Sequence, residues 1–132
     1  EKKFNDLIKE ESMLFQEFLD DILKNGEISL ILIEGKYTHS IKKIAKKGDF
    51  RVQDDHGGKV VDYNATHGEI NFAKKCLEAT DYTPIYARVD IIYDNNNKPS
   101  LSELELIEPE LWFRNYPQAA KLLAESIYNK YF

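Results

Sequence analysis

The fold of this chain is decided by residues 86–107, which read YARVDIIYDNNNKPSLSELELI. Both ends of this stretch alternate apolar with polar side chains, as β-strands do, and the asparagine-rich middle is typical of a hairpin turn. Because side chains alternate across a strand, Arg88 and Asp90 share one face of the first strand. Glu103 and Glu105 share one face of the second strand in the same way. Pairing of the two strands can therefore bring an arginine and three carboxylates together.

The charged face has two interpretations. An antiparallel sheet with one solvent-exposed face also alternates apolar and charged residues, so the pattern alone fits an ordinary half-buried hairpin. Carboxylates side by side in a sheet repel one another, however, unless a cation lies among them. A hard divalent ion with carboxylate oxygen ligands answers that need, and the stretch therefore also predicts a metal site.

The size and composition of the chain limit what it can be. Its 132 residues are enough for one compact domain with a buried core, and a hydrophobic content of 42% argues against disorder. The net charge of −5 argues against a nucleic-acid partner, although lysines cluster within residues 42–47. The single cysteine, Cys76, excludes an internal disulfide. No apolar run reaches the length of a membrane span and no secretory signal is visible, so we expect a cytoplasmic protein without a membrane partner.

The other elements follow from hydrophobic spacing and turn residues. Residues 28–33 form an apolar, mostly β-branched run that predicts a central strand. Thr66 and Glu69 fit a capping box, which predicts the start of a helix that continues through Leu77. Pro117 is a favoured first-turn residue and predicts a last helix. The expected elements are a helix over 2–11, an extended segment over 13–19, strands over 28–33, 37–42, 86–93 and 101–107, a loop over 45–59, and helices from 67 and 117.

Antiparallel strands mixed with helices define the α+β class. The expected architecture is one antiparallel sheet with helices packed on one face. No repeat or internal linker divides the chain, so residues 1–132 are expected to form a single domain. The chain opens Glu1-Lys2-Lys3 without an initiator methionine, and we therefore expect a piece of a longer protein or a processed terminus.

Several motifs occur in a characteristic order along the chain. They are Phe15-Gln16-Glu17-Phe18-Leu19, Lys24-Asn25-Gly26-Glu27, Glu34-Gly35-Lys36, Gly48-Asp49-Phe50-Arg51-Val52-Gln53 with Gly57-Gly58, Ala87-Arg88-Val89-Asp90, and Glu103-Leu104-Glu105-Leu106-Ile107-Glu108-Pro109. In this order and spacing the chain resembles the carboxyl-terminal subdomain of ATP-grasp ligases. Within that family it is most similar to the glutathione-synthetase-like branch. The resemblance covers nearly the whole chain from residue 13 onward, and it rests on the order of the motifs rather than on any one of them.

The resemblance implies roles for the charged residues. Asp90, Glu103 and Glu105 correspond to ligands of Mg²⁺, with Mn²⁺ as an alternative, that bridge nucleotide phosphates. Arg88 corresponds to the arginine that stabilises negative charge on the transferring phosphoryl group, although a salt bridge to a neighbouring carboxylate would be an ordinary structural role. Arg51 is similar to a second arginine that contacts phosphate or substrate.

The resemblance also implies a nucleotide site. The strand equivalent to Glu17, Phe18 and Leu19 offers backbone amide and carbonyl groups to the adenine of ATP. Glu27 corresponds to the acid that takes the ribose hydroxyls, whereas from the residues alone it is equally a solvated turn acid after Asn25 and Gly26.

The chain departs from the family pattern in two ways. The third position of the last strand's motif is Glu105, where asparagine is commonest, and this adds a negative charge. The preceding half of the nucleotide clamp, with its phosphate-binding lysines, is missing from the chain. We therefore expect the carboxyl-terminal subdomain of an enzyme whose isolated fragment is inactive and exposes apolar surface that favours a homo-oligomer.

The resulting hypothesis is an ATP-dependent ligase that joins a small-molecule carboxylate to an amine or a thiol through an acyl phosphate. Two alternatives from other classes stay open. One is a non-catalytic nucleotide-binding or regulatory domain that kept the fold. The other is a metal-dependent phosphodiesterase, since clustered carboxylates also build two-metal sites, but the acidic balance of the chain disfavours it.

Overall fold

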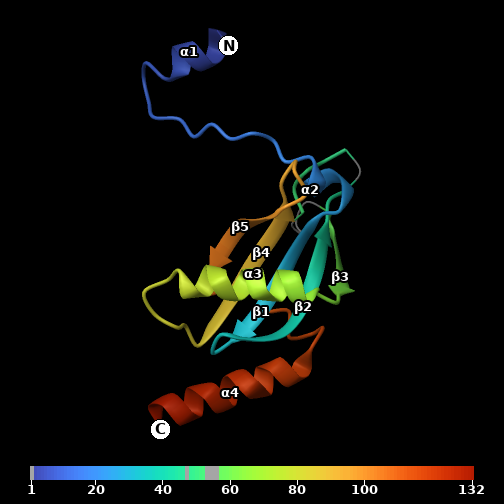
Figure 1. Cartoon of the computed structure of the whole chain (residues 1–132), viewed down its shortest axis with the longest axis vertical. Coiled ribbons are helices and arrows are strands. Elements are labelled where there is room, and N and C mark those ends of the chain that lie inside the picture. The colour runs from blue at the N-terminus through green and yellow to red at the C-terminus, as the bar shows by residue number, and fades with distance from the viewer. Residues whose placement is uncertain (1, 47, 53–56) are drawn as a thin grey trace.

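The computed structural model describes residues 2–46, 48–52 and 57–132. Within them lie one five-stranded antiparallel sheet, in the order β3-β2-β1-β4-β5, and four helices (Figure 1). The strands are β1 (Glu27–Ile33), β2 (Lys36–Ile44), β3 (Lys59–Tyr63), β4 (Tyr86–Tyr93) and β5 (Pro99–Glu105). The helices are α1 (Lys2–Leu7), α2 (Asp21–Lys24), α3 (His67–Glu78) and α4 (Pro117–Tyr131). This arrangement confirms the α+β class and the antiparallel sheet.

The central strand is β1, as its apolar sequence predicts. Every residue of β1 is buried, and the strand pairs with β2 on one side and with β4 on the other. A branched apolar run suits this position because a central strand is covered on both faces. The turn from β1 to β2 uses Gly35 at a φ of 72°, a left-handed conformation that glycine adopts without strain.

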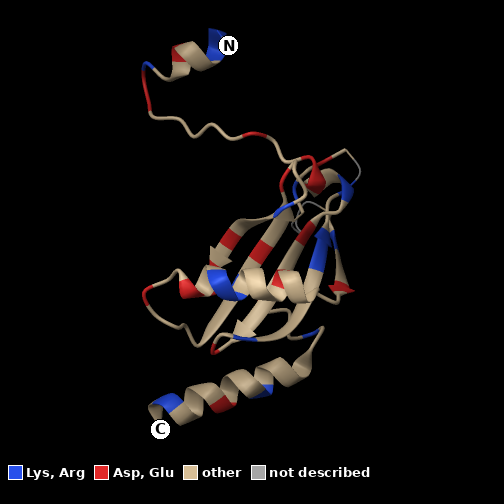
Figure 2. Cartoon of the chain, in the orientation of Figure 1, with Lys and Arg blue, Asp and Glu red and all other residues tan. Residues whose placement is uncertain are grey.

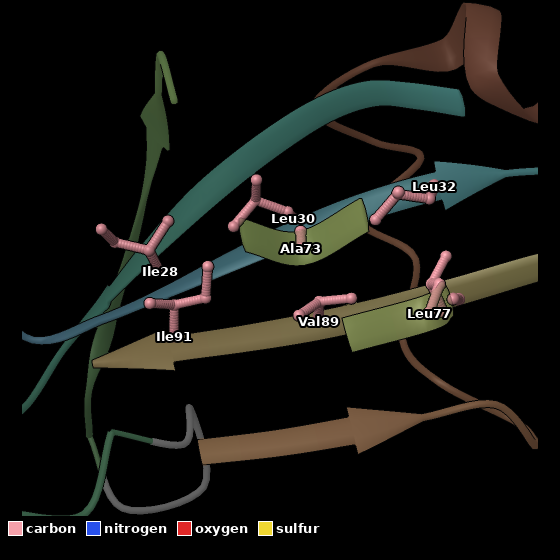
Figure 3. Packing of buried hydrophobic residues seen from close by; sticks show 8 residues of the cluster. Ile28, Leu30, Leu32, Ala73, Leu77, Val89 and Ile91 are labelled. Atoms are coloured by element: carbon pink, nitrogen blue, oxygen red, sulfur yellow. The ribbon is translucent and has the colours of Figure 1, made fainter. Parts of the chain in front are cut away.

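The main core lies between α3 and one face of the sheet (Figure 3). Ala73 and Leu77 of α3 pack against Leu30, Val89 and Ile91, which alternate along β1 and β4. The helix begins where the sequence predicts. The Thr66 hydroxyl accepts a hydrogen bond from the Glu69 backbone N–H at 3.3 Å, and the Glu69 carboxylate accepts one from the Thr66 N–H at 2.7 Å. This capping box satisfies donors that a helix start leaves unpaired.

The opposite face of the sheet has a smaller apolar cluster at one end. Ile31 and Ile41 pack there with Leu111 and Trp112, and Leu123 of α4 packs against the same group. The expected architecture placed the helices on one face. Helix α3 fits that expectation, and α4 adds a contact with β1 on the other face.

Several expected elements and boundaries differ from the structure, and helix α2 was also absent from the prediction. Strand β3 was absent from the prediction, because its residues are largely exposed at a sheet edge and form no apolar run. Helix α1 ends at Leu7 rather than at residue 11, and it stands apart from the sheet at the end of an extended segment (Figure 1). Strand β5 begins at Pro99, two residues early, because Asp94 N–H already donates to the carbonyl of Lys98 at 2.8 Å and closes a tight turn.

Candidate functional site

The charged residues of the hairpin lie on the face of the sheet opposite α3. Cα pairing across β4 and β5 sets Arg88 opposite Glu105 and Asp90 opposite Glu103. Directly paired residues of antiparallel strands point to the same face, so these four side chains share one surface. Their neighbours along β4 point the other way, into the core beneath α3. Figure 2 shows acidic and basic positions on the strands toward the end of the sheet that lies near α2.

A bulge in β5 adds a hydroxyl to this face. The register shifts so that Asp90 pairs with Glu103 but Ile91 pairs with Leu101, which leaves Ser102 as the extra residue. A bulge re-aims the side chain that it carries. The Ser102 hydroxyl accordingly donates to Glu27 Oε2 at 2.7 Å, across from β5 to β1.

Arg88 is the centre of the acidic group. Its Nε lies 3.1 Å from both carboxylate oxygens of Asp90, and its Nη2 lies 2.7 Å from Glu103 Oε2 and 2.5 Å from Glu105 Oε2. A planar guanidinium with several donors suits three carboxylates at once. Burial acts to lower the pKa of Arg88, but Asp90, Glu105 and Glu103 outweigh it and raise that pKa. The arginine therefore stays charged.

Lys43 of β2 provides a second cation. Its Nζ contacts Glu27 and lies 2.9 Å from Asp90 Oδ2. The charged cluster thus comprises Glu27, Lys43, Arg88, Asp90, Glu103 and Glu105. Four carboxylates against two cations give it a formal charge of −2.

A cavity of about 550 Å³ opens beside the charged cluster. The predicted site residues that line it are Glu17, Phe18, Leu19, Glu27, Arg51, Arg88 and Glu103. Asp90 is fully buried in contact with Arg88 and Lys43, and Glu105 contacts Arg88 from β5. Segments far apart in the sequence therefore meet around one space of a size that accommodates a small molecule.

Two further predicted residues, Glu27 and Arg51, also have partners within the protein. Glu27 is largely buried and its carboxylate is bound by Lys43 and Ser102. Arg51 is exposed, and its Nη2 lies 2.7 Å from Asp49 Oδ2. The guanidinium of Arg51, through hydrogen bonding, lowers the pKa of Asp49 well below its usual range. Gln53, which belongs to the same sequence motif, lies outside the described residues.

The carboxylate oxygens of Asp90, Glu103 and Glu105 suit a hard cation, but all three carboxylates already contact Arg88. Glu103 and Glu105 keep side chains that are 55% and 28% exposed, so their oxygens face solvent at the edge of the site. Carboxylate oxygens are the ligands that Mg²⁺ prefers. Among the described residues, no three acidic, histidine or cysteine side chains form a ready metal-binding group. A metal at this position would have to share the carboxylates with Arg88.

Sequence reasoning missed two members of the site. Lys43 looked like part of a surface lysine cluster, although its alternation with Ile41 and His39 along β2 was a usable signal for an inward position. Ser102 reaches the site only because of the bulge, and no pattern in the sequence marks it. Ser29, on the same face and directly opposite Asp90, is fully buried and its hydroxyl has no partner among the described residues.

Comparisons with known proteins identify the family and the fold of the chain. A family model described as the RimK-like ATP-grasp domain matches residues 2–106. The chain therefore belongs to the RimK-like ATP-grasp family, and the glutathione-synthetase-like branch is compatible with that membership. No curated protein matches the chain in sequence.

Solved structures show the same fold. A crystal structure of the D-cycloserine synthetase DcsG is similar with a TM-score of 0.71 and 24% identity, over 85% of this chain and 40% of that one. The D-alanine–D-alanine ligase of Bacillus anthracis in complex with ATP is similar with a TM-score of 0.57 and 17% identity, over 78% of this chain and 36% of that one. A second structure of that ligase gives 0.55 and 20%, over 78% of this chain and 38% of that one. The chain spans about two fifths of the length of these enzymes.

No helix in the described part of the chain is both long and apolar enough to cross a bilayer.

Proposed function

We propose that the protein carrying this chain is an ATP-dependent ligase that joins a carboxylate to an amine or a thiol. The observation that carries the proposal is that one cavity is lined by the extended segment 16–19, by Arg88 and by Glu103. Membership of the ATP-grasp family and the structural likeness to two ligases support the same class. A nucleotide lying along this cavity would have its base beside residues 16–19 and its phosphates beside the charged cluster.

The proposed reaction has two steps. The substrate carboxylate attacks the γ-phosphorus of ATP, the bond from that phosphorus to the bridging oxygen breaks, and ADP leaves. The amine or thiol then attacks the carbonyl carbon of the acyl phosphate, inorganic phosphate departs, and the nucleophile loses its proton. Positioning and charge stabilisation do most of the work in such phosphoryl transfers.

Arg88 is proposed to stabilise negative charge on the transferring phosphoryl group and on the acyl phosphate. Its guanidinium faces the cavity and is held at both Nε and Nη2, so its orientation is fixed before a substrate arrives. A preorganised cation costs little reorganisation during reaction. Arg51 lies on the same cavity and could release Asp49 to contact phosphate or substrate, since both groups are at the surface.

Glu103, Glu105 and Asp90 are proposed to hold Mg²⁺, or Mn²⁺, together with the phosphates. The metal, when bound, neutralises charge on the phosphate oxygens. The formal charge of −2 on the cluster and the oxygen donors of the two exposed glutamates support this assignment. A ribose contact by Glu27 remains part of the proposal, and it requires the Glu27 carboxylate to exchange Ser102 or Lys43 for a ribose hydroxyl.

Phosphate release from ATP tests the proposal. The complete protein, supplied with candidate carboxylates, should release phosphate only when an amine or a thiol acceptor is added. A non-catalytic nucleotide-binding domain would bind ATP without turnover under every condition. A metal-dependent phosphodiesterase would cleave phosphodiesters and would not need the acceptor, so either result would replace the ligase assignment.

A further inference from the structure

The side chain of Asn95 holds the backbone of the segment beside the cavity. Its Nδ2 donates to the carbonyl of Phe18 at 3.1 Å, and its Oδ1 accepts from the N–H of Asp20 at 3.1 Å. In an extended chain, a carbonyl and the N–H two residues later point to the same side. One primary amide therefore binds both groups, as a neighbouring β-strand would. Asn95 lies in the turn between β4 and β5, far from residues 18 and 20 in sequence.

The turn that carries Asn95 does not depend on this side chain. The Asp94 carboxylate accepts from the backbone N–H groups of Asn96 and Lys98, at 2.9 and 2.8 Å. Backbone hydrogen bonds from Asp94 to Lys98 and from Asn97 to Asp94 close the turn as well. The side-chain amide of Asn95 therefore hydrogen-bonds the extended segment rather than the turn itself.

The contact fixes which backbone groups face the cavity. Successive residues of an extended chain point their backbone groups to opposite sides. With Phe18 C=O and Asp20 N–H directed at Asn95, the carbonyl of Glu17 and the N–H of Leu19 point away from it. Glu17, Phe18 and Leu19 line the cavity, whereas Asn95 lines a separate polar recess beside α2. In the part of the chain that the structure describes, neither Glu17 C=O nor Leu19 N–H has a hydrogen-bond partner.

We infer that Asn95 is a positioning residue that sets base specificity by holding Glu17 C=O and Leu19 N–H in place for adenine. The inference rests on the proposed nucleotide site. Adenine offers an amino donor at N6 beside a ring acceptor at N1, which matches a carbonyl and an N–H two residues apart. Hypoxanthine reverses both groups, with a carbonyl at C6 and a proton on N1. The fixed backbone therefore accepts ATP and rejects ITP. With ITP, the Glu17 carbonyl would face another acceptor and the Leu19 N–H would face another donor.

The test compares ATP with ITP. Dissociation constants of both nucleotides are measured by titration calorimetry on the complete protein, for the wild type and for Asn95→Ala. The wild type should prefer ATP, and Asn95→Ala should reduce the ratio of the two constants about tenfold, as the loss of one net hydrogen bond would. Tripolyphosphate has no base and should bind both proteins equally.

The neighbouring Asn96→Ala is the matched control. It removes the same side chain from the same turn but keeps the backbone N–H that Asp94 accepts from, so its ratio should equal that of the wild type. Asn95→Asp is a second variant, for use if Asn95→Ala does not fold. It can still accept from Asp20 N–H but can no longer donate to Phe18 C=O, and the ratio should fall again.

The outcomes separate the inference from the function on which it rests. An unchanged ratio in Asn95→Ala and Asn95→Asp would overturn the role of Asn95, even if both variants melt early, because a purely structural contact does not choose between bases. A wild type that binds ATP and ITP equally, or binds neither, would instead overturn the proposed adenine site, and the role of Asn95 with it.

Discussion

The Nζ of Lys43 lies 2.9 Å from Oδ2 of Asp90, and the two side chains are only 9% and 0% exposed. The same ammonium contacts Glu27, so one lysine of β2 joins carboxylates from β1 and β4. Buried charges persist only when they are paired. Arg88 completes the pairing of Asp90 from the other side. Lys43 therefore stabilises the floor of the cavity, and the positions of Asp90 and Arg88 depend on it.

Replacement of Lys43 should cost much more stability than replacement of its neighbour. Lys43→Met leaves Glu27 without its cation and removes one of the two cations that bind Asp90, and breaking a buried pair costs about 3–5 kcal/mol. Lys42→Met is the matched control. Lys42 contacts the ring of Tyr63, 4.5 Å from its centroid, and belongs to no buried pair, so its loss should cost under about 1 kcal/mol. Urea unfolding of both variants measures the difference, and equal losses would show that Lys43 is not a buried counter-ion.

Arg88→Lys should impair catalysis more than nucleotide binding. Lysine keeps the charge but loses the planar group that binds Asp90 through Nε and Glu103 through Nη2. If Arg88 stabilises the transferring phosphoryl group, kcat should fall by at least about tenfold while the Kd for ATP changes less. Single-turnover kinetics and nucleotide titration give the two values. A variant that melts early yet turns over at the wild-type rate would place Arg88 in the fold alone.

Metal binding should depend on the two glutamates of β5. Glu103→Gln and Glu105→Gln each remove a charged oxygen donor, and each should weaken binding of Mn²⁺ in the presence of ATP by about tenfold or more. Electron paramagnetic resonance of free Mn²⁺ measures this directly. Glu78→Gln makes the same change of charge at an exposed position of α3, on the opposite face of the sheet, and should have no effect. Equal behaviour of all three variants would exclude Glu103 and Glu105 as ligands.

The hairpin was predictable because patterns within a short stretch of sequence specify it. Alternation along residues 86–93 fixes which side chains share a face, and one buried face then sets how the strands pair. The capping box of Thr66 and Glu69 was predictable for the same reason, since both partners lie within one helical turn.

The rest of the site depends on contacts between distant segments. Lys43 meets Asp90 across β1, and although its alternation with Ile41 and His39 indicates an inward position, nothing in β2 itself identifies Asp90 as its partner. Ser102 turns toward Glu27 through a bulge that the sequence does not mark. Asn95 looked like one of several interchangeable turn residues, and only the folded chain shows that its amide binds the backbone of Phe18 and Asp20.

Gly26 should tolerate no side chain. Its φ is 75°, and a Cβ atom would lie 2.1 Å from the backbone oxygen of Lys43, so Gly26→Ala must strain the turn and displace β2. We expect a loss above about 2 kcal/mol. Gly68→Ala is the control, because that Cβ would come no closer than 3.8 Å to Thr66 Oγ1 in the first turn of α3. It should be neutral or stabilising by up to about 1 kcal/mol. Chemical denaturation distinguishes the two, and a stable Gly26→Ala would contradict the close approach.

Stability should decline in acid through His39. The ring is buried between β2 and the segment after β5, where its Nε2 donates to Leu111 O at 3.0 Å. Burial lowers the pKa of His39 below 6.5, although hydrogen bonds to the carbonyls of Leu111 and Trp112 oppose that effect. The unfolded chain therefore binds a proton at a pH where the folded chain does not. The contribution of the neutral ring is fully present above pH 6.5 and is lost as the pH falls from there through the lower pKa of the folded state.

Free energies of unfolding measured from pH 8 to pH 5 should fall more steeply for the wild type than for His39→Gln, which cannot titrate. Identical slopes for the wild type and His39→Gln would remove His39 as the cause.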